Sequence, residues 1–92
     1  MNLVVKPAFR RDRNKITNVP LLDELANKLE QIENATSPEN ITGLKLLEGY
    51  STHCRIYVKT ERQSYRIGAI IRGNTIWLVR FLPRKKIYQQ FP

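Results

Sequence analysis

The chain has 92 residues, a length that fits a single domain over residues 1–92 with one modest core and no separate cofactor domain. Its 16 Lys and Arg outnumber its 8 Asp and Glu, which gives a formal net charge of +8. No apolar run approaches the ~20 residues that span a bilayer, and the N-terminus lacks a signal-peptide pattern, so a cytoplasmic location is expected.

The first 37 residues predict a short strand followed by two helices. Leu3-Val4-Val5 is an apolar run that Pro7 ends, and Pro7 is itself tolerated in the first turn of a short charged helix reaching Lys15. Asn18 is a suitable cap for a second helix, which must end before Ser37-Pro38. The apolar residues of this second helix recur at spacings of three and four, and they predict its buried face: Leu22, Leu25, Ala26, Leu29 and Ile32.

The rest of the chain predicts a connection, three strands and a last short helix. Residues 39–50 are interpreted as the connection, and from His53 the apolar period changes to two, which is typical of strands. Pro83 ends the last strand and favours a helix over residues 84–90. This order is typical of an α+β fold with two helices on one face of an antiparallel sheet. The predicted strands and intervening turns are residues 53–59, 60–63, 64–72, 73–74 and 75–82.

The strand alternation indicates which side chains share the face that the helices leave open. Side chains two apart in a strand point the same way. If the apolar residues at 54, 56 and 58 face the helices, the residues at 55, 57 and 59 face away from them. Arg66 of the next strand then faces away as well. Arg84 and Tyr88 follow the last strand closely enough to reach the same surface. The open face is therefore expected to carry a polar set: Arg55, Tyr57, Lys59, Arg66, Arg84 and Tyr88.

All of the net charge lies in the C-terminal part of the chain, residues 53–92. Residues 1–52 contain seven basic and seven acidic side chains, whereas residues 53–92 contain nine basic side chains and one acid, Glu61. The net charge is therefore zero in the first part and +8 in the second. A basic field held by one segment of a small domain indicates a polyanionic partner, which could be RNA, DNA, an acidic protein or, least favoured, an anionic membrane.

The chain offers no recognisable set of metal ligands. His53 and Cys54 are its only histidine and cysteine, and one of each with scattered acids does not make a metal site, so neither metal nor cofactor is expected. Cys54 is expected to be buried, and His53 to be structural or solvated rather than a proton acceptor. Tyr65 and Trp77 are expected to pack in the core.

Two motifs in the C-terminal part resemble the RelE/ParE superfamily of bacterial toxins, and its RelE branch most. Tyr65-Arg66-Ile67 is similar to the Tyr-Arg-aliphatic signature of the superfamily, and the run LVRFLPRKKIY at residues 78–88 is similar to the family ending LVRFLHRKxIY. The first strand, the helical hairpin and Gly49-Tyr50 match in order and length. The resemblance implies a RelE-like sheet, antiparallel except at a mixed N-terminal strand, with a two-helix hairpin on one face and a short C-terminal helix.

The resemblance also implies a function. The implied protein is the toxin of a type II toxin–antitoxin system. The implied activity is that of a metal-independent endoribonuclease, which cleaves messenger RNA on the ribosome and so inhibits translation. The resemblance implies that the 2′-hydroxyl of the substrate attacks the adjacent phosphorus, which leaves a 2′,3′-cyclic phosphate, or its opened 3′-phosphate, and a free 5′-hydroxyl. The implied partners are messenger RNA with the ribosome, and a cognate antitoxin through which alone the toxin would reach operator DNA.

The family roles transfer to matching residues of this chain. Arg66 and Arg84 are implied to stabilise the transition state, because the guanidinium fork matches phosphate oxygens. Arg55 is implied to bind the neighbouring phosphate or position the substrate, and Tyr88 to transfer a proton or to stack on the base at the cut. These four form the catalytic set, and the implied RNA-binding residues are Tyr57, Lys59, Lys85 and Lys86.

The sequence departs from the family at the second strand. Nucleases of the family carry two lysines on its open face, where this chain has Arg55 and Tyr57. The general base is therefore left open between Tyr88, Tyr57 and Lys59. Two other functions also stay open: a ParE-like inhibitor of DNA gyrase without catalysis, and an inactive module that binds nucleic acid or its antitoxin.

Overall fold

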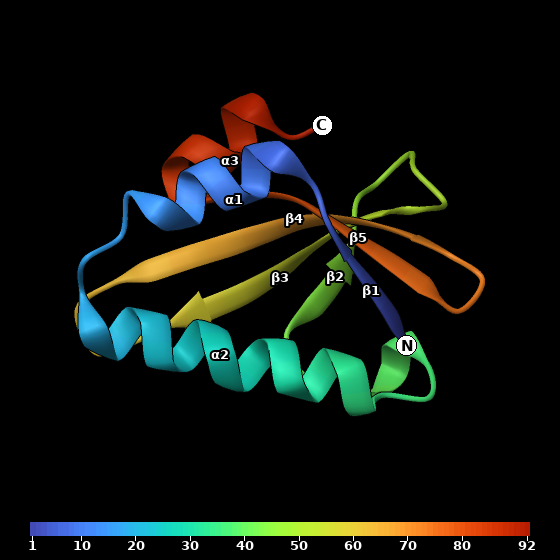
Figure 1. The fold of residues 1–92 in the computed structure, drawn as a ribbon. Helices are drawn as coiled ribbons and strands as arrows, with labels where there is room; N and C mark the ends of the chain where they lie inside the picture. The colour runs from blue at the N-terminus through green and yellow to red at the C-terminus, as the bar shows by residue number, and fades with distance from the viewer.

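The computed structural model describes residues 1–92, and all of its strands join one sheet (Figure 1). The sheet has five strands in the order β1-β5-β4-β3-β2. The elements in chain order are β1 (Asn2–Val5), α1 (Pro7–Asn14), α2 (Val19–Asn34), the 3-10 helix η1 (Pro38–Asn40), β2 (Leu44–Leu46), β3 (His53–Lys59), β4 (Ser64–Arg72), β5 (Thr75–Pro83) and α3 (Arg84–Gln90).

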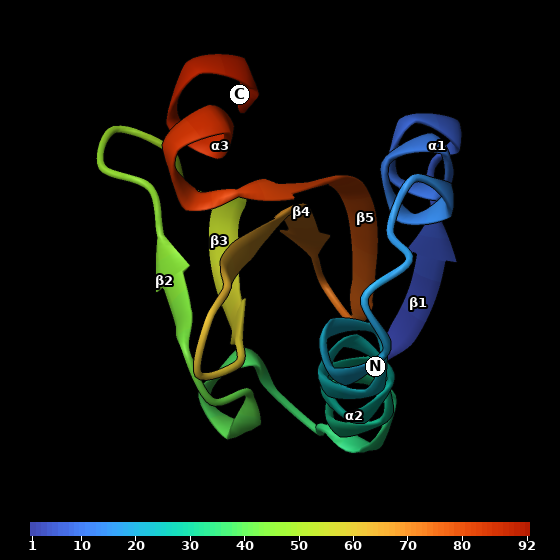
Figure 2. The ribbon, with the colours of Figure 1, turned by 90° about the vertical axis from the view of Figure 1, so that its left-hand side faces the viewer.

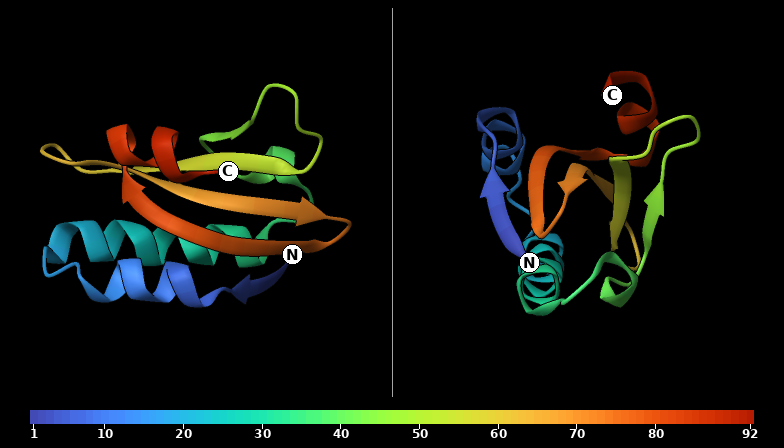
Figure 3. Two further views of the ribbon diagram at one scale, coloured as in Figure 1. Left: turned by 90° about the horizontal axis from the view of Figure 1, so that it is seen from above. Right: turned by 90° about the vertical axis from the view of Figure 1, so that its right-hand side faces the viewer.

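The α+β class and the mixed sheet are confirmed. β1 runs parallel to β5, and every other neighbouring pair is antiparallel. Seen from above, α1 and α2 lie on one side of the sheet and α3 lies on the other (Figure 3). The turned view shows α1 near β1 at one margin of the curved sheet, whereas α3 lies against the inner strands β4 and β5 (Figure 2). None of these helices has the length and apolar character to cross a membrane.

Helix α2 supplies much of the core, although its buried face differs from the predicted one. The cap is as expected, because the Asn18 side chain accepts a hydrogen bond of 3.0 Å from the Leu21 backbone N–H. The inward series begins at Leu21 rather than Leu22, so Leu22 is only half-buried and Ala26 is exposed. The helix residues that belong to the core are Leu21, Leu25, Ile32 and, partly buried, Leu29.

The segment predicted as an irregular connection contains a strand, and that prediction was wrong. β2 pairs antiparallel with β3 in the register Leu44↔Ile56, Lys45↔Arg55 and Leu46↔Cys54. Three residues are too few to show a period of two, and hydrogen bonding to β3 is what holds them extended. As a result, Lys45 lies beside Arg55 on the open face of the sheet.

A bulge in β5 changes which of its side chains face the core. Gly68 pairs with Arg80 but Ala69 pairs with Leu78, so Val79 is an extra residue in β5. Leu78 and Phe81, three apart, are consequently both fully buried. Trp77 is half-buried and outside the core cluster, so the prediction that it is core was wrong: its neighbours in β5, at 76 and 78, take the inward positions.

A buried carboxylate accepts a backbone N–H of β5 beyond the point where β1 ends. β1 pairs with β5 only as far as Val5 and Leu78, and beyond that point α1 lies against β5. Asp12 of α1, 6% exposed, accepts the Phe81 backbone N–H at 3.0 Å and binds Arg80 through both carboxylate oxygens, at 2.7 and 3.1 Å. The pair of Arg80 and Asp12 is the one salt bridge of the molecule. The same carboxylate satisfies the Phe81 N–H, which would otherwise be unpaired at this edge of the sheet.

Candidate active site

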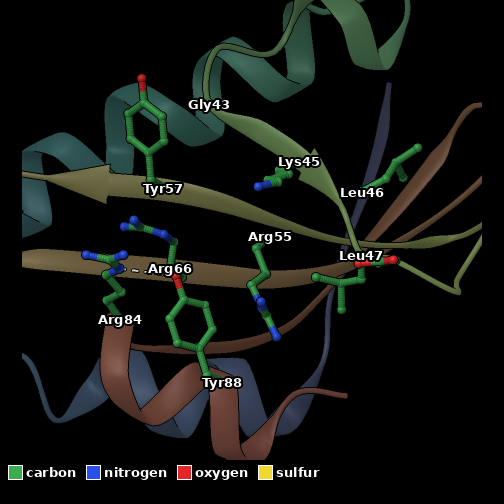
Figure 4. A pocket seen from close by; sticks show the side chains of 10 residues that line it. Gly43, Lys45, Leu46, Leu47, Arg55, Tyr57, Arg66, Arg84 and Tyr88 are labelled. Carbon is green, nitrogen blue, oxygen red and sulfur yellow. Dashed lines mark hydrogen bonds between the residues drawn. The ribbon is translucent and has the colours of Figure 1, made fainter.

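A cleft of about 450 Å³ opens on the face of the sheet that α1 and α2 leave uncovered (Figure 4). Its walls come from the β2 region, the central strands β3 and β4, and α3. The lining residues are Gly43, Lys45, Leu46, Leu47, Glu48, Arg55, Tyr57, Arg66, Arg84 and Tyr88.

Strand register and helix periodicity bring the predicted residues to this cleft. Tyr57 of β3 pairs directly with Arg66 of β4, so the two side chains stand next to each other. Arg55 lies two residues before Tyr57 and shares its face. Because α3 begins immediately after β5, its residues Arg84 and Tyr88, one turn apart, both reach the cleft. All four residues of the implied catalytic set therefore line one cleft, together with Tyr57.

Tyr88 is surrounded by guanidinium groups. The Arg84 Nε donates a hydrogen bond of 3.1 Å to the Tyr88 hydroxyl oxygen, and the Arg55 Cζ lies 4.4 Å from the centroid of the Tyr88 ring. The hydrogen bond from Arg84, followed by the charges of Arg84, Arg66 and Arg55, lowers the pKa of Tyr88 below its usual value of 10. The same hydrogen bond raises the pKa of Arg84. The phenolate form of Tyr88 is thus reached more easily here than in an ordinary tyrosine.

The cleft arginines have neutral hydrogen-bond acceptors and no carboxylate partner. Arg66 donates from Nη1 to the Ser64 hydroxyl and to the Tyr65 carbonyl, each at 3.0 Å. Arg55 donates from Nη2 to the Phe91 carbonyl at 3.2 Å, and its buried Nε has no partner. None of them is in a salt bridge. The positive field of three guanidiniums is therefore left for an anion that enters the cleft.

Three predicted RNA-binding lysines are not brought into the cleft. Lys59 lies beside it, with its Nζ 5.0 Å from the Tyr57 ring centroid. Lys85 is exposed on α3 and lines neither hollow of the surface next to that helix. Lys86 lines a second hollow with Asp12 and Arg80. Successive residues of a helix point about 100° apart, and this rotation separates Lys85 and Lys86 from the face that carries Arg84 and Tyr88.

Five residues of the cleft were not predicted from the sequence: Gly43, Lys45, Leu46, Leu47 and Glu48. They belong to the segment read as a connection, and only the pairing of β2 with β3 brings them to the site. Glu48 is the one acid among the lining residues. No sequence signal marked these positions, because neither the hydrophobic period nor a motif extends over them.

The single histidine and cysteine have packing roles, as predicted. The His53 ring packs against Tyr50 and Phe91, with centroid distances of 4.9 and 5.7 Å, and it does not line the cleft. Cys54 is fully buried, and burial raises the pKa of its thiol to about 12. Tyr65 packs against Phe81 at a centroid distance of 4.9 Å, as expected. No group of three or more His, Cys, Asp or Glu side chains is placed to hold a metal ion.

Similar proteins come from sequence and from structure comparisons, although no protein-family model matches the chain. Over 65 residues the chain is 37% identical to Toxin RelE3 of Methanocaldococcus jannaschii, covering 70% of this chain and 69% of that protein. The fold is similar to a chain in the crystal structure of the RelB–RelE antitoxin–toxin complex from Methanococcus jannaschii, with a TM-score of 0.74, 27% identity, and coverage of 97% of this chain and 99% of that one. A copper-bound mutant toxin from Helicobacter pylori shares the fold alone, with a TM-score of 0.57, 15% identity, and coverage of 95% and 98%.

Proposed function

The chain belongs to the RelE family of type II toxins, and on that premise we propose that it is a metal-independent endoribonuclease that cleaves messenger RNA on the ribosome and so inhibits translation. The observation that carries the proposal is the set of three guanidiniums, free of carboxylates, gathered around the hydroxyl and ring of Tyr88. A phosphodiester needs such charge when its phosphorus becomes five-coordinate.

Arg66 and Arg84 are the groups proposed to stabilise the transition state. The 2′-oxygen attacks the adjacent phosphorus, the bond from phosphorus to the 5′-oxygen breaks, and negative charge builds on the non-bridging oxygens between these steps. Guanidinium forks donate two hydrogen bonds to such oxygens and stay charged at any working pH. Arg55, whose buried Nε has no partner, is proposed to hold the substrate phosphate or the one next to it.

Tyr88 is the group proposed to take the proton from the 2′-hydroxyl. Arginine cannot do so because it does not lose its proton in proteins. Figure 4 shows the Tyr88 hydroxyl directed toward Arg66 and Arg84, where the phosphate would lie. Its lowered pKa increases the share of phenolate available as a base near neutral pH.

Lys45 is the group proposed to give a proton to the departing 5′-oxygen. In-line displacement places the entering and leaving oxygens on opposite sides of phosphorus. Figure 4 shows Lys45 reaching in from the β2 wall, opposite the α3 wall that carries Tyr88. Tyr88 at one wall then takes the proton of the 2′-hydroxyl, and Lys45 at the opposite wall gives a proton to the 5′-oxygen. No water is consumed in this step.

The test is primer extension on messenger RNA after a brief pulse of expression, comparing the wild type with Arg66→Ala and Arg84→Ala. Arg72→Ala is the matched control, because Arg72 is an exposed arginine of β4 outside the cleft. New cuts in translated regions are expected for the wild type and the control, and none for the two cleft variants. Growth arrest without cuts would overturn the nuclease proposal and favour gyrase inhibition; neither cuts nor arrest would leave a binding module.

An antitoxin is the proposed protein partner. The similar archaeal toxin is bound to its antitoxin RelB in the solved complex. A chain of net charge +8 favours an acidic partner whose association weakens with salt. Operator DNA would be bound only through that antitoxin, and action on ribosomes carries the expectation of a cytoplasmic location. Co-purification with the product of the neighbouring gene, lost at high salt or on deletion of that gene, checks this part of the proposal.

A further inference from the structure

The cleft holds two tyrosines, and the structure gives them different surroundings. The Tyr88 hydroxyl is hydrogen-bonded to Arg84, and the Arg55 guanidinium lies 4.4 Å from the ring centroid of Tyr88. The Tyr57 hydroxyl, by contrast, points away from Arg66 and Arg84 (Figure 4). A hydroxyl directed away from the guanidiniums is badly placed for proton transfer at a phosphate that they hold. Tyr57 therefore presents its ring, rather than its hydroxyl, to the cleft.

The Tyr57 ring packs against the backbone just before β2, at a position that only glycine fits. The Tyr57 backbone N–H donates to the Gly43 carbonyl at 3.3 Å, so the two residues face each other across the strands. A Cβ at Gly43 would lie 2.4 Å from the Tyr57 Cε1, and the φ angle of Gly43 is +82°. Both the lack of space for a Cβ and the left-handed backbone at this position thus require glycine. The ring has a firm support on this side, and it lines the cleft with its remaining surface.

Three cations surround the Tyr57 ring. Lys59, Lys28 and Arg66 have their charged groups 5.0, 5.5 and 5.7 Å from the ring centroid. Lys28 comes from α2, and it is anchored by hydrogen bonds to the Thr42 carbonyl at 2.7 Å and to the Gln31 side chain at 3.1 Å. These cations lie over the ring, and an aromatic ring next to cations is an arrangement that binds single-stranded RNA. The base stacks on the ring in place of a cation, and the cations meet the phosphates.

We propose that Tyr57 is a nucleobase-stacking platform, which binds the base of a nucleotide next to the cleaved phosphate while Tyr88 acts on the ribose hydroxyl. Gly43 and Lys28 are positioning residues that keep the Tyr57 ring in place. This inference rests on the proposed function, and it assigns the second wall of the same cleft. Stacking of one base on an aromatic side chain corresponds to about 10- to 100-fold in affinity.

The test measures binding of a fluorescent 2′-O-methyl RNA tetranucleotide, which cannot be cleaved by 2′-hydroxyl attack, and of four versions in which one position at a time is abasic. Tyr57→Ala is expected to weaken binding of the intact probe at least tenfold. It should cause no further loss on the probe that lacks the stacked base. Tyr57→Phe should bind like the wild type, since the ring alone is needed.

Gly43→Ala is expected to weaken binding like Tyr57→Ala, because its Cβ displaces the ring. Gly49→Ala is the matched control: Gly49 also has a positive φ angle, +83°, but nothing lies within 4 Å of its Cβ position. The control should lose stability through backbone strain and keep its affinity for RNA. In cleavage assays Tyr57→Ala should raise KM with kcat nearly unchanged, whereas loss of a group acting on the ribose lowers kcat.

Three results would overturn the proposal. The first is equal binding of the intact probe by Tyr57→Ala and the wild type, and the second is an equal loss for Tyr57→Phe and Tyr57→Ala. The third is a Tyr57→Ala defect of the same size on every abasic probe. Because these probes are not cleaved, a wild type that binds them with the expected coupling but cuts no RNA would contradict the nuclease function and leave the stacking site standing.

Discussion

Arginine has opposite surroundings at the α1–β5 edge and in the cleft. At the edge, Arg80 binds both oxygens of a buried carboxylate, Asp12, at 2.7 and 3.1 Å. In the cleft, Arg66 and Arg84 donate to a hydroxyl, a carbonyl and a phenol, and they have no carboxylate partner. A paired guanidinium has its charge neutralised and holds the fold, whereas an unpaired one keeps its field for a ligand.

A basic sequence does not by itself show which of its arginines bind a ligand. The motif residues 80 and 84 are four apart in one basic run, and nothing in the local sequence distinguishes a structural arginine from a functional one. The distinguishing feature is the carboxylate of Asp12, which comes from a helix 68 residues earlier in the chain.

The largest expected effect is on cleavage when a cleft arginine is lost. Arg84→Ala or Arg66→Ala should lower kcat/KM about 100- to 1,000-fold, because each removes a charged donor aimed at the transition state. The urea midpoint of unfolding should stay near that of the wild type. Arg66→Lys should recover little of the loss, since an ammonium does not supply the guanidinium fork. A cleft variant that unfolds at much lower urea would show that its arginine is structural after all.

The next effect is on stability when the edge pair is broken. Asp12→Ala should lower the free energy of unfolding by about 3 kcal/mol, because it leaves Arg80 and the Phe81 N–H without their partner. This value is at the low end of the range for breaking a buried ion pair, since the Arg80 side chain is 25% exposed to solvent. Urea unfolding measures it, with the exposed Asp23→Ala on α2 as control. The folded fraction should cleave RNA normally. An unchanged midpoint would refute the structural role of the pair.

A smaller effect is expected in the pH profile of cleavage. The pKa of Tyr88 lies below its usual value of 10, so the fraction of phenolate, and with it kcat/KM, should rise with pH at a lower pH than for an ordinary tyrosine. Tyr88→Phe should be slow and without this rise. Arg84→Gln removes the largest cause of the lowered pKa, so its rise should move to higher pH. If the same rise persists in Tyr88→Phe, another group is the base.

The smallest effect compares two lysines of equal charge. Lys45 lines the cleft, whereas Lys86 lies in the second hollow beside Asp12. Lys45→Ala should lower kcat/KM about tenfold or more, as for loss of a general acid, and Lys86→Ala should change it about twofold through the overall field alone. Cleavage of a short RNA at two salt concentrations measures both. Equal losses that vanish at high salt would mean that Lys45 contributes charge and no proton.

The sequence by itself predicted every helix and strand except β2 and η1, and it predicted half of the residues that line the cleft. The strand and helix patterns, the Asn18 cap and the Pro83 boundary depend on neighbours in the chain, and they were read correctly. The alternation in β3 and β4 placed Arg55, Tyr57 and Arg66 on the open face, since a period of two is a local property. Membership of the RelE family followed from one motif in β4 and a second that extends from β5 into α3.

The remaining features of the fold and the cleft depend on contacts between distant segments, and these contacts form only in the tertiary structure. The pairing of β2 with β3 brought Lys45 beside Arg55 and Gly43 under Tyr57. The bulge at Val79 turned Phe81 inward, and α1 supplied Asp12 to Arg80 at the edge that β1 leaves free. These features are set by the register of the sheet and by packing against it. A short strand, a bulge and an ion pair between distant residues have no period in the sequence from which they could be read.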